Sequence, residues 1–135
     1  GATASEARSF GCRFDVMSFS WLPPACYDDL LVNDFLASEP WEWFLDPLGT
    51  QPVPLETVQK GDVAQMYVSW RYHKVHCVFM WKKMHRALEN GHIIDAYIIN
   101  YNHTNHCSNM LIMTEPARSS SIQTIIRRKF VGCGV

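Results

Sequence analysis

The clearest pattern of apolar and polar positions at helical spacing runs from Asp62 to Asn90. Asp62 is followed three residues later by Gln65, which is the spacing of a helix capping box. Gly91 comes directly after the pattern, where a residue in the left-handed conformation commonly ends a helix. The pattern therefore predicts one helix over residues 62–90. At 1.5 Å per residue this helix would be roughly 40 Å long, so we expect it to be the central element of the fold.

Weaker patterns predict the other elements. Apolar residues at helical spacing indicate a helix over residues 27–37 and a second helix over residues 102–114, which Pro116 ends. The remaining segments are predicted as a short helix or a tail over 1–11, a short helix or an extended connection over 93–101, a polar linker over 118–124, and a short strand or a tail over 125–135.

Residues 39–54 contain four prolines and therefore indicate a non-helical segment. Its aromatic residues Trp41, Trp43 and Phe44 are expected to pack into the core rather than to line a substrate site. Taken together, the patterns predict a mainly α fold. It would be a small single domain over residues 1–135, with one long central helix, a second motif helix and a long irregular N-terminal segment held by disulfides.

The composition supports one ordered domain and excludes some partners. The chain has 135 residues, of which 47% are hydrophobic, and it includes five Trp and seven Phe. Twelve basic residues against thirteen acidic ones leave a formal net charge of -1. This balance argues against nucleic acid or an anionic membrane surface as the main partner. No apolar run approaches the roughly 20 residues that a transmembrane helix needs.

Two stretches of the chain, thirty positions apart, share the pattern H-x-x-H-C-x-x-M. Histidines three residues apart are neighbours on a helix surface, so each pair can chelate a metal or face the other pair. A packed, hydrogen-bonded pair is the ordinary explanation for one such motif, whereas its repetition favours a metal site. The residues that we predict as metal ligands and catalytic residues are His73, His76, His103 and His106.

Copper is the metal that these stretches favour. Neither stretch contains Asp or Glu, which argues against carboxylate-rich di-iron or di-manganese sites and against the facial triad of iron oxygenases. Imidazoles with soft sulfur nearby suit copper, whereas a closed set of four His or Cys ligands would suit zinc. We therefore predict one or two copper ions, with zinc less favoured. Met80 and Met110 are expected to fill the core, and we exclude His85 and His92 from the site.

The five cysteines leave a question open because their number is odd. Cys77 and Cys107 directly follow the two histidine pairs, and they could be thiolate ligands, disulfide partners or inert buried thiols. In an oxidising compartment a disulfide is favoured. There Cys12 and Cys26 could also pair and hold the N-terminal third of the chain.

These residues resemble the UstYa-like proteins of fungal natural-product pathways. The mark of that family is a pair of H-x-x-H-C motifs, which here begin at His73 and His103. The resemblance extends over nearly the whole chain. Four flanking stretches are also similar to a frequent subgroup of the family: Gly11–Asp15, Ser20–Asp28, Trp81–Leu88 and Cys133–Gly134.

The resemblance implies a copper-dependent enzyme that modifies a small-molecule or peptide natural product by C–H oxidation, oxidative cyclisation, hydroxylation or halogenation, with O2 or a peroxide as co-substrate. Members of the family usually carry an N-terminal transmembrane helix. The chain starts at Gly1 without Met or a signal peptide, so we expect a membrane anchor ahead of it and the domain in the lumen of the secretory pathway. A homodimer is compatible with this picture.

Two other functions stay open on the residues alone. The first is a metal-assisted cyclase without net oxidation, in which the metal acts as a Lewis acid. The second is a non-enzymatic domain, in which the histidines hold structural zinc or form an interaction surface.

Overall fold

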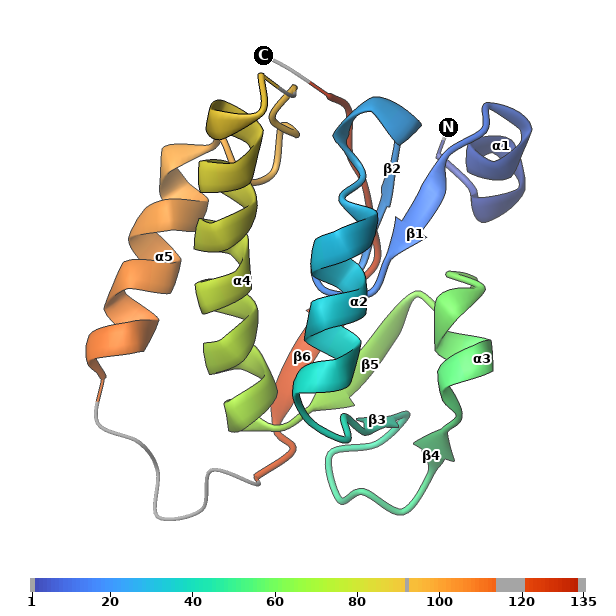
Figure 1. Cartoon of the computed structure of the whole chain (residues 1–135). Coiled ribbons are helices and arrows are strands. Elements are labelled where there is room, and N and C mark those ends of the chain that lie inside the picture. Colours follow the sequence, from blue (N-terminus) through green and yellow to red (C-terminus); the bar gives the residue numbers. More distant parts are fainter. Residues whose placement is uncertain (1, 92, 114–120, 134–135) are drawn as a thin grey trace.

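Two small β-sheets and five α-helices form the part of the chain that the computed structural model describes, residues 2–91, 93–113 and 121–133 (Figure 1). The expected mainly α fold is therefore wrong, and the fold is α/β. Each strand contains only two to four residues. Such strands are too short to show a clear alternation of apolar and polar residues, which is why the sequence patterns did not reveal them.

Both sheets combine segments from distant parts of the chain. In the first, with strand order β1-β2-β7, β1 (Arg13–Asp15) pairs antiparallel with β2 (Ser20–Leu22), and β7 (Lys129–Phe130) pairs with β2 in parallel. The second is antiparallel and has the order β4-β3-β5-β6. Its strands are β3 (Trp43–Phe44), β4 (Pro52–Val53), β5 (Gln65–Val68) and β6 (Thr124–Arg127). Of the short strand or tail expected over residues 125–135, the structure has strands, β6 and β7.

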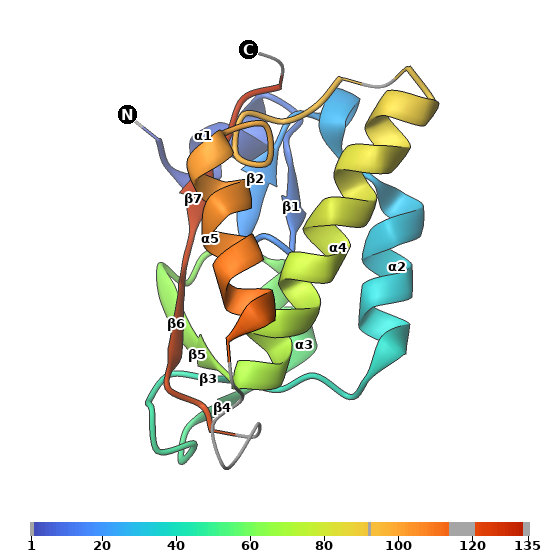
Figure 2. The ribbon, with the colours of Figure 1, turned by 90° about the vertical axis from the view of Figure 1, so that its left-hand side faces the viewer.

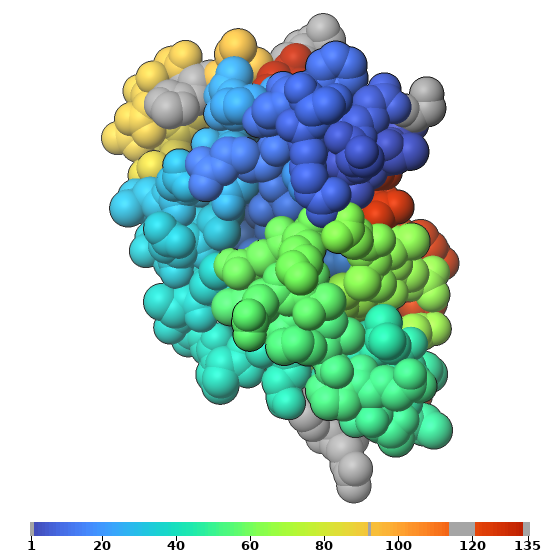
Figure 3. Space-filling view, turned by 90° about the vertical axis from the view of Figure 1, so that its right-hand side faces the viewer, coloured from blue at the N-terminus to red at the C-terminus, as the bar shows by residue number. Residues whose placement is uncertain are grey.

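Three of the helices lie side by side, with α4 between α2 and α5 (Figures 1 and 2). The helices are α1 (Ala4–Ser9), α2 (Asp29–Ser38), α3 (Leu55–Gln59), α4 (Trp70–Glu89) and α5 (Tyr101–Ile112), and a 3-10 turn spans Pro24–Cys26. Within the described residues, no helix combines the length and the apolar character that crossing a membrane requires. The N-terminal segment, α2 and α3 cover the face of the molecule turned away from α5 (Figure 3).

The long helix begins later than the sequence predicted. Asp62 does not cap a helix, because its carboxylate binds the guanidinium of Arg8 at 2.6 Å. The residues that follow form β5, where Met66 and Val68 are buried and their neighbours are more exposed. The helix α4 starts after Ser69, whose hydroxyl accepts a hydrogen bond from the first turn. Its predicted end is confirmed, since Gly91 follows with a φ of 68°.

The helices expected over residues 27–37 and 102–114 are confirmed as α2 and α5. Asp28 and Asn100 are their N-caps, and each side chain accepts a hydrogen bond from a backbone N–H of the first turn. The segment between α4 and α5 is a connection rather than a helix. The stop expected at Pro116 and the start of the linker expected over 118–124 fall outside the described residues.

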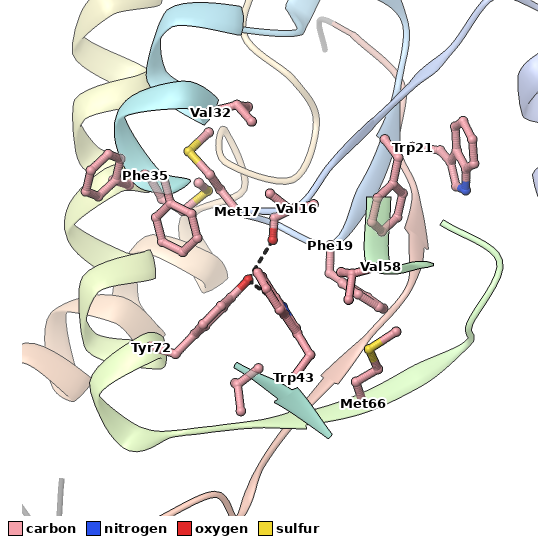
Figure 4. Close-up of a cluster of buried hydrophobic side chains, with 14 of the residues drawn as sticks. Val16, Met17, Phe19, Trp21, Val32, Phe35, Trp43, Val58, Met66 and Tyr72 are labelled. Carbon is pink, nitrogen blue, oxygen red and sulfur yellow. Dashed lines mark hydrogen bonds between the residues drawn. The ribbon is translucent and has the colours of Figure 1, made fainter. Parts of the chain in front are cut away.

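Aromatic side chains dominate the core behind α4 (Figure 4). Phe35 of α2 stacks on Trp41 and meets Tyr72 of α4 edge to face. The Tyr72 hydroxyl donates a hydrogen bond to the Val16 carbonyl at 2.8 Å and accepts one from the Trp43 indole at 3.2 Å. The core placement expected for Trp41 and Trp43 is confirmed, whereas Phe44 is half-buried and lies outside this core. The core ties α4 to the turn between β1 and β2.

Two disulfides cross-link the fold. Cys77 of α4 is bonded to Cys107 of α5, which confirms the favoured expectation for these two residues. Cys26 is bonded to Cys133, so the expected pairing of Cys26 with Cys12 is wrong, and Cys12 is a half-buried free thiol. The C-terminal strand β7 lies beside β2, and this places Cys133 next to the 3-10 turn that contains Cys26.

Candidate metal centre

The structure brings the four predicted histidines into one cluster. His73 and His76 lie on the first half of α4, and His103 and His106 lie on the facing helix α5. The Nε2 atoms of His73 and His106 are 3.3 Å apart. The ring centroids of His76 and His103 are 5.8 Å apart, and those of His73 and His76 are 6.2 Å apart. Imidazole nitrogens from both helices therefore face a common space.

The disulfide defines both the spacing of the helices and the set of ligand atoms. Cys77 and Cys107 each follow a histidine pair by one residue, so the bond joins α4 and α5 beside the cluster. The Cys107 sulfur lies 3.6 Å from the His103 Nε2. One ligand atom each of Cys107, His103 and His76 lies within 4.8 Å of the others, a separation that would suit a shared metal. A sulfur in a disulfide has no thiolate charge, however, and metals bind the thiolate. Of the alternatives open for Cys77 and Cys107, the disulfide therefore takes the place of thiolate ligands.

A backbone carbonyl sets the orientation of His76. Its Nδ1 lies 2.5 Å from the carbonyl oxygen of Met17, in the turn between β1 and β2. A carbonyl oxygen only accepts hydrogen bonds, so we assign the proton to Nδ1 and the free lone pair to Nε2. Metal-binding histidines commonly carry such a hydrogen bond on the nitrogen that does not bind the metal.

Burial keeps three of the imidazoles neutral. It lowers the pKa of His76 to about 3 and those of His73 and His103 to about 4. The neighbouring imidazoles lower these pKa values further, because a second positive charge in the cluster would repel the first. At neutral pH these histidines are free bases, which is the form that binds a metal.

Tyr97 is a member of the site that the sequence analysis did not identify. It lies in the connection between α4 and α5, where its ring centroid is 4.1 Å from that of His103. Its hydroxyl is 3.4 Å from the His76 Nε2. Burial raises the pKa of this hydroxyl, so it stays protonated and can donate to the imidazole. The local sequence is merely apolar and contains no signal that would have indicated this role.

A buried ion cluster supports the two turns that contact His76. The Lys83 ammonium is 2.7 Å from a carboxylate oxygen of Asp95 and 3.3 Å from one of Asp15, and all three residues are at most 3% exposed. Asp15 accepts the backbone N–H of Met17 at 2.8 Å, and Asp95 accepts that of Tyr97 at 3.0 Å. Each carboxylate therefore holds one neighbour of His76 in place.

The position of Lys83 in the sequence was a usable signal for this cluster. Lys83 follows His76 by seven positions, which is two helical turns, so it lies on the same inward-facing side of α4. A lysine at such a position needs a buried acidic partner. Burial alone would lower the pKa of Lys83, but Asp15 and Asp95 together raise it, so the ammonium stays charged.

The other residues considered from the sequence lie outside the cluster. His85 is exposed on α4, 3.7 Å from Glu89, and its exclusion is confirmed. His92 is outside the described residues. Met80 belongs to the main core and Met110 packs on the disulfide, so both fill the interior as expected.

Two pockets flank the histidines. The strand-side pocket, of about 280 Å³, is lined by three of the four histidines together with Tyr97 and residues of the β1–β2 turn, β6 and β7. The helix-side pocket, of about 330 Å³, lies between α4 and α5 and is lined by His103, the disulfide and mostly apolar side chains. Ligands could therefore reach the cluster from either side.

The fold and the cluster together define a disulfide-linked α/β domain in which four histidines from two helices lie close together. Phomopsin biosynthesis cluster protein B′ and phomopsin biosynthesis cluster protein B, both from Diaporthe leptostromiformis, are each 29% identical to this chain over 119 residues. The matched region is 80% of this chain and 34% of each relative, so the chain spans about a third of the length of the curated relatives it matches. The chain is thus similar to proteins of a fungal biosynthesis cluster. No protein-family model and no solved structure matches it.

Proposed function

We propose that this chain is the copper-binding domain of an oxidative tailoring enzyme in fungal natural-product biosynthesis, of the UstYa-like kind that its sequence resembles. The observation that carries the proposal is the convergence of two histidine pairs from α4 and α5. These two helices lie side by side in Figure 2. The similarity to phomopsin biosynthesis cluster proteins supports the biosynthetic setting.

The chemistry of the cluster fits a metal that prefers imidazole. Two nitrogens at about 2.0–2.1 Å from one metal ion, at a tetrahedral angle, are roughly 3.3 Å apart. His73 and His106 already have their Nε2 atoms at this separation. The Nε2 of His76 carries the ring's lone pair, which a metal could take over from the Tyr97 hydroxyl, and burial keeps the ring neutral. A set of imidazole ligands without a thiolate suits copper better than it suits an ion that prefers carboxylate ligands.

A copper ion at this position would supply one-electron chemistry for the activation of O2 or a peroxide next to a substrate C–H bond. The residues of the chain have separate tasks. The disulfide keeps α4 and α5 at a fixed spacing, and Met17 holds the tautomer of His76. Tyr97 closes the cluster on one side. The substrate, a peptide or small molecule, would enter through one of the two flanking pockets. We also propose that the enzyme is anchored in a membrane and that this domain faces the secretory lumen.

Metal analysis of the protein purified without added metal tests the proposal. Wild-type protein is expected to contain copper and to give a Cu(II) EPR signal with nitrogen hyperfine splitting. The variants His73→Ala and His106→Ala should lose most of the copper, while His85→Ala, on the exposed side of the same helix, should keep it. Copper content unchanged in both site variants would refute the proposal, and stoichiometric zinc held by four histidines would favour the structural alternative.

A further inference from the structure

The strand-side pocket carries positive charge at its wall. Arg127 of β6 and Lys129 of β7 line it beside His73 and His106. Among the described residues that line this pocket, none is an aspartate or a glutamate. The pocket therefore presents two basic side chains and several imidazoles to whatever enters it.

The Lys129 ammonium has polar neighbours but no described anionic partner. It donates a hydrogen bond to the Arg127 carbonyl at 2.9 Å and lies 4.8 Å from the centre of the Tyr97 ring. Within the described part of the chain, no carboxylate forms an ion pair with it. Burial lowers the pKa of Lys129 to about 8, and Asp15 opposes this lowering from a distance. Lys129 is therefore mostly charged at neutral pH, in a place where water solvates it poorly.

This arrangement of the half-buried Lys129 contrasts with that of the buried Lys83. The ammonium of Lys83 is neutralised by Asp15 and Asp95 within the protein. Charged groups that are removed from water are stabilised by an opposite charge. Lys129 lines the strand-side pocket, so a negatively charged group that enters this pocket can supply that charge. Arg127 on the same wall has a planar fork of donors that matches a carboxylate.

We infer that the strand-side pocket binds its substrate through a carboxylate held by Lys129 and Arg127. The inference rests on the proposed function in that it names the substrate class for the same centre. A volume of about 280 Å³ accommodates a carboxylate and the adjoining part of a chain rather than a whole peptide. Met17 and Ile126 line the same pocket and offer apolar surface to that adjoining part, and His73 and His106 are also part of its wall.

Binding of a matched pair of small compounds tests this inference. Hydrocinnamate and its neutral amide have the same aromatic skeleton and differ in charge. Each is titrated by NMR into the protein after removal of metal with a chelator, and signals of β6 and β7 are followed. Hydrocinnamate should bind roughly tenfold more tightly than the amide, which corresponds to one charge-assisted hydrogen bond.

Variants assign the preference to its residues. Lys129→Met and Arg127→Gln should each remove most of the preference for the carboxylate, whereas Lys129→Arg should keep it. Lys60→Met removes an exposed lysine at the end of α3 and should behave like wild type. The exposed Arg127 is replaceable without disturbing the core, so its variant remains informative if Lys129→Met does not fold.

The outcomes separate this inference from the copper proposal. Equal affinity for the two compounds, no detectable binding of either, or a preference that survives Arg127→Gln overturns the carboxylate site. Because the titration uses metal-free protein, a protein that never takes up copper can still show the preference. In that case only the proposed function fails.

Discussion

Replacement of Lys83 with methionine would show how strongly the fold depends on one buried ammonium group. Methionine fills a similar volume and removes the charge between the carboxylates of Asp15 and Asp95. Removing one partner of a buried ion pair commonly costs about 3–5 kcal/mol, because the remaining charge has no compensation. Here two carboxylates remain, both almost without solvent exposure, so we expect a loss of about 3–5 kcal/mol in the free energy of unfolding.

Urea denaturation followed by tryptophan fluorescence measures this loss at neutral pH. The matched control is Lys82→Met at the adjacent position, because Lys82 is exposed. Its ammonium lies 4.7 Å from the centre of the Phe79 ring, which is a weak cation–π contact. A loss below about 1 kcal/mol is expected there. Equal stability of the two variants at neutral pH would refute the reasoning.

Three further predictions concern the cross-links and the cluster. Replacing Cys26 and Cys133, which are 107 positions apart, by alanine should lower the free energy of unfolding by about 4–5 kcal/mol in the same urea assay. Replacing Cys77 and Cys107, which are 30 positions apart, should lower it by about 3–4 kcal/mol, because a shorter loop restricts the unfolded chain less. The reverse order would contradict this explanation by chain entropy. The metal-free protein should lose stability as pH falls below 6.5 towards about 4, because the unfolded chain takes up protons at three histidines whose pKa values the fold lowers. Constant stability in urea titrations between about pH 7 and about pH 5 would speak against neutral, buried imidazoles. Tyr97→Phe should change the NMR shifts of the His76 ring while altering stability by less than about 1.5 kcal/mol, and unchanged ring shifts would show that the hydroxyl does not act on this imidazole.

The candidate site was easier to predict than the fold. The spacing of His73 and His76 within a helix, and its repetition at His103 and His106, are local properties of the sequence, and helices follow from local spacing. The pairing of β2 with β7 and of β5 with β6 joins residues about 60 to 110 positions apart. No local pattern records such a pairing, and for this reason the α/β class was missed.

The errors in detail have the same origin. Asp62 has the right spacing for a capping box, but a distant partner, Arg8, takes its carboxylate. Cys26 was matched with the nearest cysteine, Cys12, although the fold brings Cys133 to it. Tyr97 joins the cluster because the connection between the helices turns back on α5. In each case a contact between remote segments decides the outcome.

Residues 121–133 follow both histidine motifs in the sequence, and this sets the order in which the parts of the described fold are made. Residues 121–133 supply β6, β7, the wall of the strand-side pocket and the partner of Cys26. A ribosome releases this stretch after all four histidines, so a growing chain can contain the complete motif pair and still lack the cavity and one cross-link. Completion of the strand-side pocket and of the Cys26–Cys133 cross-link therefore comes later than synthesis of the two histidine motifs.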